Sequence, residues 1–184
     1  MAVRVPPKGT RGTRFPRFVS GLFSGFMVRQ FRPRGMRTQG GVQTLMLETT
    51  GAKSGATRHA VLGYLQESPR SWLVIASLAG SSRNPAWLHN VANRPEATAE
   101  FDGGRRIGVR AESLDSDELV VAWDRIGREA PEYVKYLSQT SRDIPVIRLR
   151  QRTQPPTASC GSAPASHGRS SSARSSRCRA LSSD

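Results

Sequence analysis

The sequence is short of cysteine and histidine. Its only two cysteines, Cys160 and Cys178, lie within residues 151–184, and its three histidines, His59, His89 and His167, are far apart in the chain. No disulfide framework or cysteine–metal centre can therefore shape the part of the chain before residue 151. The histidine spacing does not match that of a zinc cluster, and we expect no metal site.

Long hydrophobic runs are also missing. No apolar run in the 184 residues is long enough to cross a bilayer. The basic N-terminal residues are not followed by the apolar stretch and small-residue cleavage site of a secretory signal. We therefore expect one soluble domain with tails, located in the cytoplasm.

Acidic residues are missing from residues 1–41, which contain nine Lys and Arg. Residues 42–150 contain fourteen basic and thirteen acidic residues, and residues 151–184 contain five Arg and one Asp. The net charge of +14 is thus concentrated at the two ends. Basic ends indicate contact with an anionic surface, either lipid headgroups or nucleic acid, and carry no information about the nearly neutral middle.

The N-terminal region divides into two parts. Residues 1–13 are rich in Pro, Gly, Arg and Thr, and we expect them to be disordered. Residues 14–41 begin with apolar residues at helical spacing, which predicts an amphipathic helix followed by a linker. The apolar positions are Phe15, Phe18, Val19, Leu22, Phe23, Phe26 and Met27. Two interpretations of this stripe are open: it packs on the protein's own core, or it binds a membrane surface.

From Val42 onwards apolar residues alternate, which is typical of strands. The predicted strands are 42–49, 60–66, 71–77, 97–101, 105–113 and 144–149, with a hairpin turn at Asp102-Gly103-Gly104. Helices are predicted from Asn84 to Asn93, from the capping-box pair Asp115 and Glu118 to about Arg128, and after Pro131. Short, mostly antiparallel strands with marginal helices predict an α+β fold built on a small barrel, over residues 42–150.

Residues 151–184 differ in composition from the rest of the chain. They are rich in Ser, Arg, Ala and Pro and have almost no large apolar residue, which predicts disorder. Two interpretations are open: a functional disordered tail, or the translation of a shifted, GC-rich reading frame. We favour the second, because the predicted domain is already complete at its last strand.

Two segments carry the residue types that bind anions. The first is the glycine-bracketed loop from Thr49 to Gly55, with Lys53 and Ser54 at its tip and Arg58 shortly after it. The second is the predicted helix start at Asn84, an Asn N-cap with a Pro at the first helical position. Both arrangements can bind phosphate, so together they indicate one elongated, phosphate-bearing ligand. The alternative for the loop is a plain hairpin, in which Gly serves only the turn.

Two pairs of residues, each three apart on a predicted helix, are candidate ligand contacts. Trp87 and Asn90 share a face that could receive a flat ring, or they are core and surface residues without a ligand. Tyr133 and Tyr136 could close over a substrate, or they form a half-buried helical turn. The sequence has no serine-hydrolase signature and no evident acid–base carboxylate pair. The reactive group therefore belongs, by this reasoning, to a cofactor.

These segments together resemble the deazaflavin-dependent nitroreductase family of actinobacteria. The resemblance covers about residues 18–149 and is carried, in order, by Leu47–Gly55 with Arg58, Gly63-Tyr64-Leu65, Ala76-Ser77, Asn84–Asn90 and Ile144-Pro145-Val146. It implies a split β-barrel of the FMN-binding type that binds coenzyme F420, whose deazaflavin ring transfers hydride to quinones or nitroaromatic compounds. Several members of that family associate with membranes.

The resemblance also implies roles for individual residues. Lys53, Ser54, Gly55 and Arg58 would hold the phosphate and acidic tail of the cofactor, and Trp87, Leu88 and Asn90 would line its deazaflavin and ribitol. Ser77 and Tyr133 would face the substrate as catalytic hydrogen-bond donors, with Tyr136 in a lid. Two positions depart from the family pattern: Ala52 stands where an Arg is usual, and Leu78-Ala79-Gly80 replaces a segment with a glycine pair. Each departure is expected to weaken cofactor binding.

We therefore predict an F420H2-dependent reductase of a quinone-like or nitroaromatic acceptor, with FMN as the alternative cofactor and an oligomer as an open possibility. Its N-terminal helix would hold it on the inner face of the membrane. The second hypothesis is a split-barrel protein that binds flavin, deazaflavin or haem without turnover. A nucleic-acid-binding protein is the third, and the absence of an aromatic stacking set speaks against it.

Overall fold

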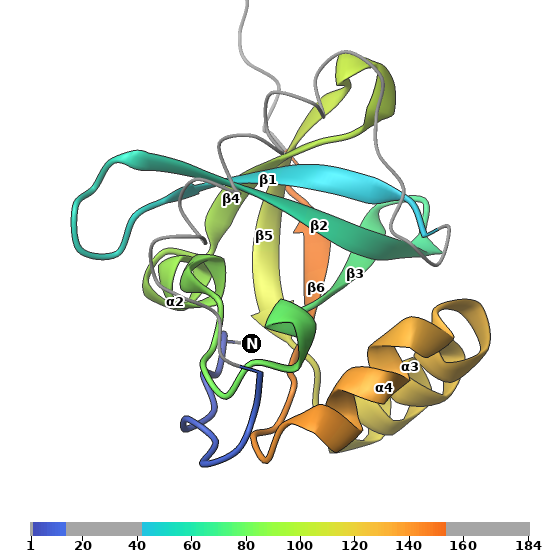
Figure 1. Ribbon diagram of the computed structural model, residues 1–184. Coiled ribbons are helices and arrows are strands. Elements are labelled where there is room, and N and C mark those ends of the chain that lie inside the picture. Colours follow the sequence, from blue (N-terminus) through green and yellow to red (C-terminus); the bar gives the residue numbers. More distant parts are fainter. Residues whose placement is uncertain (1, 14–41, 154–184) are drawn as a thin grey trace, which may run out of the picture. The chain divides into compact units, whose positions relative to one another are not determined.

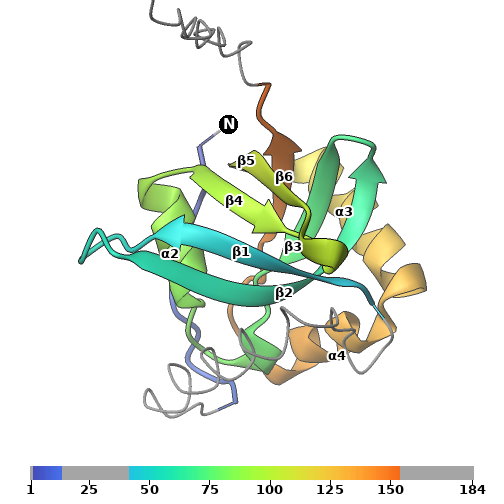
Figure 2. The same cartoon turned by 90° about the horizontal axis from the view of Figure 1, so that it is seen from above.

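The computed structural model describes residues 2–13 and 42–153. Six antiparallel strands close into a barrel in the order β1-β2-β3-β6-β5-β4 (Figures 1 and 2). The strands are β1 (Thr44–Thr50), β2 (Thr57–Ser68), β3 (Ser71–Ile75), β4 (Glu96–Glu100), β5 (Arg106–Ser113) and β6 (Val146–Gln151). The helices of this part of the chain are α2 (Ala86–Asn93), α3 (Ser116–Glu129) and α4 (Pro131–Gln139). The predicted α+β barrel is confirmed.

The barrel interior is the first of two hydrophobic clusters. Alternate residues of every strand point into it, and Leu45, Leu47 and Val74 are completely buried there. The rings of Trp72 and Phe101 pack together with their centroids 4.8 Å apart. Helix α2 adds its own apolar residues to this interior cluster, so the helix is fixed directly to the barrel.

The second hydrophobic cluster lies outside the barrel, between strands and helices. Leu65 of β2, Leu73 of β3 and Val146 of β6 form its strand side. Helices α3 and α4 cover this surface, with Ile126 completely buried. Figures 1 and 2 show both helices on the side of the barrel away from α2. The molecule thus has a barrel with one helix on one side and a helical pair on the other.

The two predicted helix starts have different outcomes. The capping box at α3 is confirmed: the Asp115 carboxylate accepts from Glu118 N at 2.8 Å, and Asp115 N donates to the Glu118 carboxylate at 3.0 Å. The Asn N-cap of α2 is wrong, because the helix begins at Ala86 with Pro85 as its N-cap. The Asn84 amide is engaged elsewhere: it donates to the Pro6 carbonyl at 2.6 Å.

The expected disorder of the N-terminus is wrong for residues 2–13. Val3 and Val5 pack against the interior cluster, so this segment buries apolar area that composition alone undervalues. Gly9 N donates to Ser82 O at 2.9 Å, Thr13 N donates to Gly80 O at 3.0 Å, and Thr13 and Ser81 form a parallel bridge. We call residues 6–13 the N-terminal strap.

The amphipathic helix predicted within residues 14–41 and most of the tail predicted at 151–184 lie outside the described residues, as do residue 1 and both cysteines. No helix in the described part of the chain is long and apolar enough to cross a membrane.

Candidate functional site

The loop between β1 and β2 is a tight turn that projects from the barrel (Figure 1). Gly51 N donates to Ala56 O and Gly55 N donates to Gly51 O, both at 2.8 Å. Gly55 has φ of +67°, in the left-handed region that glycine adopts without strain. The glycines therefore serve the turn, and they also leave its tip open to solvent.

The tip of this loop presents cations and unpaired amides. Lys53, Ser54 and Arg58 are all exposed. The Ser54 hydroxyl accepts from Ala56 N at 3.3 Å and from the Arg58 guanidinium at 3.5 Å, which draws Arg58 towards the loop. Within the described residues, the backbone N–H groups of Lys53 and Ser54 have no hydrogen-bond partner. Free amides beside two cations form an anion-binding surface.

Asn90 anchors this loop to α2. Its side-chain oxygen accepts from Ala52 N at 3.0 Å, and its side-chain nitrogen donates to the Thr49 hydroxyl at 3.0 Å. The Asn90 side chain is buried, with 7% of the residue exposed. Both ends of the amide are thus used within the protein, so Asn90 is a loop anchor in this structure, not a free ligand contact.

The other two residues expected to line a cofactor ring belong to the hydrophobic core. Leu88 is completely buried and Trp87 is 6% exposed, and both pack in the interior cluster. The expectation that Leu88 contacts the ring does not fit this burial. Trp87 and Asn90 share the buried face of α2, as their spacing predicts, but that face is turned to the barrel and the loop.

Ser77 follows β3 and opens a strained turn. The next residues, Leu78 and Ala79, have φ of 43° and 47°, and Gly80 has φ of 72°. Non-glycine residues in the left-handed region are costly and persist only where the surroundings enforce them. This turn, η1 (Leu78–Gly80), contacts α4, so Ser77 lies at the junction of barrel and helical pair.

Tyr133 and Tyr136 lie on α4 beside this turn. Their rings pack edge to face with centroids 5.9 Å apart. Tyr133 is 8% exposed, and burial, with a smaller contribution from Glu132, raises its pKa to about 12. The Tyr133 hydroxyl therefore stays protonated to a higher pH than that of an exposed tyrosine, and in this form it can donate a hydrogen bond.

The sequence-predicted residues thus form two groups. Lys53, Ser54 and Arg58 lie on the loop beside α2, whereas Ser77 and Tyr133 lie where η1 meets α4. Figures 1 and 2 place the loop and α2 on one side of the barrel and the helical pair on the other. A ligand that touches both groups must be elongated.

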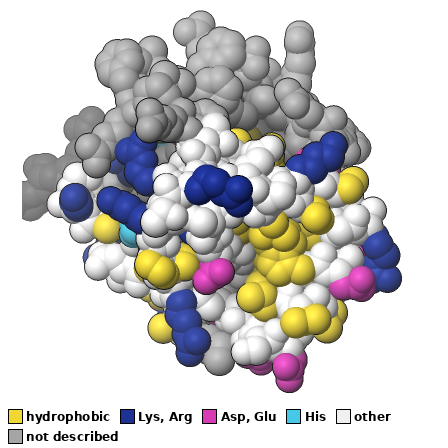
Figure 3. Space-filling model, turned by 60° about the horizontal axis from the view of Figure 1, so that its bottom comes forward, with side chains coloured by type: hydrophobic (Ala, Val, Ile, Leu, Met, Phe, Trp, Pro, Cys, Tyr) yellow, Lys and Arg dark blue, Asp and Glu magenta, His cyan; other side chains and the backbone are white. Residues whose placement is uncertain are grey.

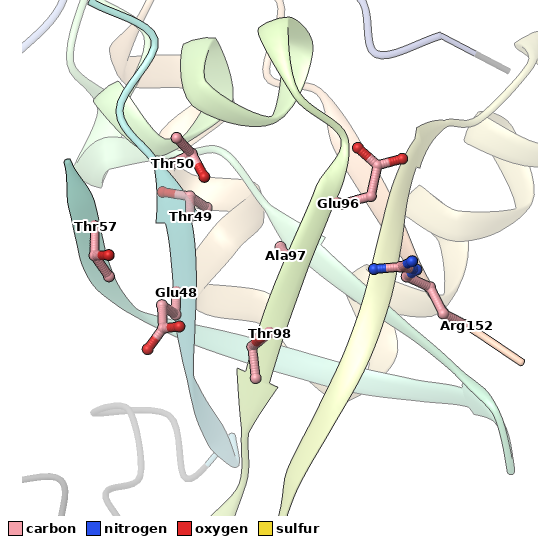
Figure 4. A pocket seen from close by; sticks show the side chains of 8 residues that line it. All are labelled: Glu48, Thr49, Thr50, Thr57, Glu96, Ala97, Thr98 and Arg152. Atoms are coloured by element: carbon pink, nitrogen blue, oxygen red, sulfur yellow. The ribbon is translucent and has the colours of Figure 1, made fainter. Parts of the chain in front are cut away.

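A hollow of ≈ 160 Å³ lies on the barrel surface at the base of the loop (Figure 4). Its lining is mostly polar and consists of Glu48, Glu96, four threonines, Ala97 and Arg152. Arg106 pairs with Glu48 at 2.9 Å, and Arg110 pairs with Glu96. Each of the two carboxylates is thus paired with an arginine, whereas the exposed charges at the loop tip, Lys53 and Arg58, are both cations.

The helical pair exposes apolar area. Four large apolar side chains of α3 and α4 are at least 40% exposed: Val120, Val121, Val134 and Leu137. Figure 3 shows hydrophobic side chains gathered on one face, with acidic and basic side chains around them. The surface of the helical pair therefore differs in character from the polar, cationic loop.

With this geometry established, comparison with known proteins gives the family. The model of the F420H2-dependent quinone reductase family matches residues 25–151. The chain belongs to this family. An F420H2-dependent quinone reductase of Mycobacterium tuberculosis is 35% identical over 121 residues, which cover 64% of this chain and 80% of the relative.

Two solved structures have a similar fold, and the first of them is named as a reductase that uses F420H2. The F420H2-dependent reductase FDR-A is 30% identical, with a TM-score of 0.52, over 58% of this chain and 93% of that one. A structure described as a domain-swapped dimer is 26% identical, with a TM-score of 0.53, over 71% of this chain and 98% of that one. The predicted family, split β-barrel fold, F420 cofactor class and reductase class are confirmed at the level of the family.

Sequence reasoning missed two buried side chains that hold the site together. Thr49 was read only as part of the loop, yet its hydroxyl accepts from Asn90 and donates to Arg58 O at 3.4 Å. Arg142 was not singled out, yet it is 5% exposed and bonds to the turn after β3. A single Arg before a strand gives no pattern from which burial can be read.

Proposed function

We propose that this protein is an F420H2-dependent reductase that reduces a quinone-like acceptor. The observation that carries the proposal is the loop tip, where Lys53 and Arg58 lie beside two backbone amides without a partner in the described part of the chain. This arrangement suits an anion, and the chain belongs to the quinone reductase family. The residues present fit the anionic part of F420. Ala52, which stands where the family usually has Arg, leaves this surface with fewer cations.

We assign the residues to two tasks. Lys53, Ser54 and Arg58 bind the phosphate and acidic tail, with Asn90 keeping the loop in position. The bound cofactor supplies a hydride from its deazaflavin ring. The Tyr133 hydroxyl, which keeps its proton, and the Ser77 hydroxyl donate hydrogen bonds to the acceptor oxygen, where negative charge develops. Tyr136 packs on Tyr133 and orients its ring.

A nitroaromatic compound is the alternative acceptor in this proposal, because its nitro oxygens also gain negative charge on reduction. The apolar surface of α3 and α4 supports an uncharged, aromatic acceptor in both cases. Contact of the segment 14–41 with a membrane stays a prediction, as does the oligomeric state.

The test is a fluorescence titration with F420 and, in parallel, with FMN. Lys53→Ala and Arg58→Ala should each weaken F420 binding roughly tenfold, about 1.4 kcal/mol, because each removes one exposed charged contact. Arg128→Ala is the matched control: it removes an equal charge from α3, where Arg128 is 72% exposed and pairs with Asp124. Unchanged F420 binding in both loop variants, or tighter binding of FMN, would contradict the proposal.

A further inference from the structure

We infer that Arg142 and the N-terminal strap are a positioning device for the substrate-facing turn after β3. This inference rests on the proposed function only for its kinetic consequence, since the contacts themselves are structural. Arg142 lies between the C-terminal end of α4 and β6, and Ser77 precedes the strained turn η1. The strap joins the two from the other side.

The guanidinium of Arg142 is saturated by backbone and amide oxygens. Its Nε donates to Ser81 O at 2.8 Å, and its Nη2 donates to Ala76 O at 2.8 Å and to Ser77 O at 2.7 Å. Its Nη1 donates to the Asn84 side-chain oxygen at 3.2 Å and to its neighbour's carbonyl at 3.0 Å. All five N–H donors are used, and no carboxylate pairs with the guanidinium among the described residues.

A buried cation without an ion pair is costly, so its position has a structural reason. Burial lowers the pKa of Arg142, as expected for a cation removed from water. Four of the five oxygens that accept from it come from one segment, residues 76–84, which contains Ser77 and the left-handed residues after it. Only the planar fork of an arginine can reach these acceptors together, whereas a lysine offers three donors from one point.

The strap fixes the same segment from outside. Gly9 N and Thr13 N donate to the carbonyls of Ser82 and Gly80. The Ser141 hydroxyl accepts from Thr10 N at 2.9 Å and from Arg11 N at 3.0 Å. The strap therefore binds both the turn and the residue next to Arg142.

The backbone is strained at Leu78 and Ala79, and a strained backbone persists only where contacts with neighbouring residues hold it in place. Arg142 and the strap provide these contacts, and they also connect the turn to the end of α4, the helix of Tyr133. The bonds of Arg142 and the strap thus hold Ser77 and Tyr133 in fixed relative positions, and the side chains of Ser77 and Tyr133 take no part in these bonds. Small displacements of reacting groups lower rates strongly, so loosening this device should slow acceptor reduction.

Two variants test the device independently. Arg142→Lys keeps the charge and loses most of the bonds to residues 76–84. Gly12→Ala leaves Arg142 intact but displaces the strap, since a Cβ there would lie 2.3 Å from Ser82 N. Gly108→Ala in β5 is the matched control, because a Cβ there meets nothing within 4 Å.

The kinetic readout is quinone reduction by F420H2 per F420-binding site. We expect kcat/KM for menadione to fall about 10- to 100-fold in both variants, with a much smaller change in F420 Kd, because the loop that binds the cofactor tail lies on the other side of the barrel. A purely structural role would lower the number of binding sites and leave the activity per site unchanged. Unchanged activity per site in both variants overturns the inference.

The second readout is amide hydrogen exchange, which does not depend on turnover. Exchange at Gly9 and Thr13 should become faster in Arg142→Lys, while exchange at Gly51 and Gly55 stays the same. If the wild-type protein binds no F420 or shows no reductase activity, the proposed function fails, and faster exchange still supports the positioning contacts. Unchanged exchange at Gly9 and Thr13 overturns those contacts as well.

Discussion

At the scale of single residues, two buried polar side chains control exposed functional segments. Asn90 holds the cationic loop through Ala52 and Thr49, and Arg142 holds the turn that follows Ser77. The charged and polar side chains of the loop tip, Lys53, Ser54 and Arg58, are exposed and make few hydrogen bonds within the protein. Substituting Asn90 or Arg142 should therefore impair the site even though the proposed function assigns neither side chain a contact with a ligand.

Asn90→Ala should reduce both stability and F420 affinity. The change leaves Ala52 N and the Thr49 hydroxyl without their partner, at a cost of about 1–3 kcal/mol. Urea unfolding measures the stability and fluorescence titration measures the affinity. His89→Ala is the matched control, since His89 is exposed on the same helix. A variant as stable and as tight-binding as His89→Ala would show that Asn90 is not an anchor.

Tyr133 should make the folded state less stable at high pH. Its pKa is raised from 10.0 to about 12 by burial, so its neutral form is favoured in the fold. The resulting contribution, about 2–3 kcal/mol, is fully present below pH 10 and is lost as the pH rises through about 12. Unfolding free energies of wild type and Tyr133→Phe should converge or cross over this range.

The control for this experiment is Tyr136→Phe, whose ring is less buried than that of Tyr133. If Tyr133→Phe and wild type keep a constant difference in unfolding free energy from pH 8 to pH 12, the Tyr133 hydroxyl is not protected by burial.

At the scale of elements, the sequence predicted those strands and helix starts that neighbouring residues determine. Alternation located all six strands, and the Asp115–Glu118 pair located the start of α3 to the residue. The start of α2 was wrong by two residues, because Asn84 has partners in Pro6 and Arg142 that are distant in the sequence. Local signals decide a helix start only where no tertiary contact competes for the capping side chain.

Asp115→Ala should lower stability by about 1 kcal/mol without changing F420 affinity. The cap satisfies two backbone groups at the start of α3, and this helix is far from the cationic loop. Urea unfolding and F420 titration together measure the two effects. Asp124→Ala should cost only a few tenths of a kcal/mol, because its ion pair with Arg128 is exposed. Equal costs for the two variants would contradict the capping role.

At the scale of the whole molecule, the sequence predicted the barrel and the helices at its margins. It did not predict the strap, because the composition of residues 1–13 carries no sign of contacts made with residues 80–84 and 138–142. The family resemblance implies that Trp87 and Leu88 line the cofactor ring, and the structure places both in the interior cluster, the alternative that the sequence left open for Trp87. Residue type and spacing identify candidate contacts, and only burial separates those that reach solvent from those that fill the interior.

The central claim is that this chain transfers reducing equivalents from F420H2 to a quinone. The most direct test is anaerobic oxidation of F420H2 by the purified protein with and without menadione, with reduced FMN in a parallel reaction. The account predicts oxidation of F420H2 that requires both protein and quinone, and no comparable turnover with reduced FMN. Binding of F420 without quinone-dependent oxidation would contradict it and would favour a protein that binds the cofactor without turnover.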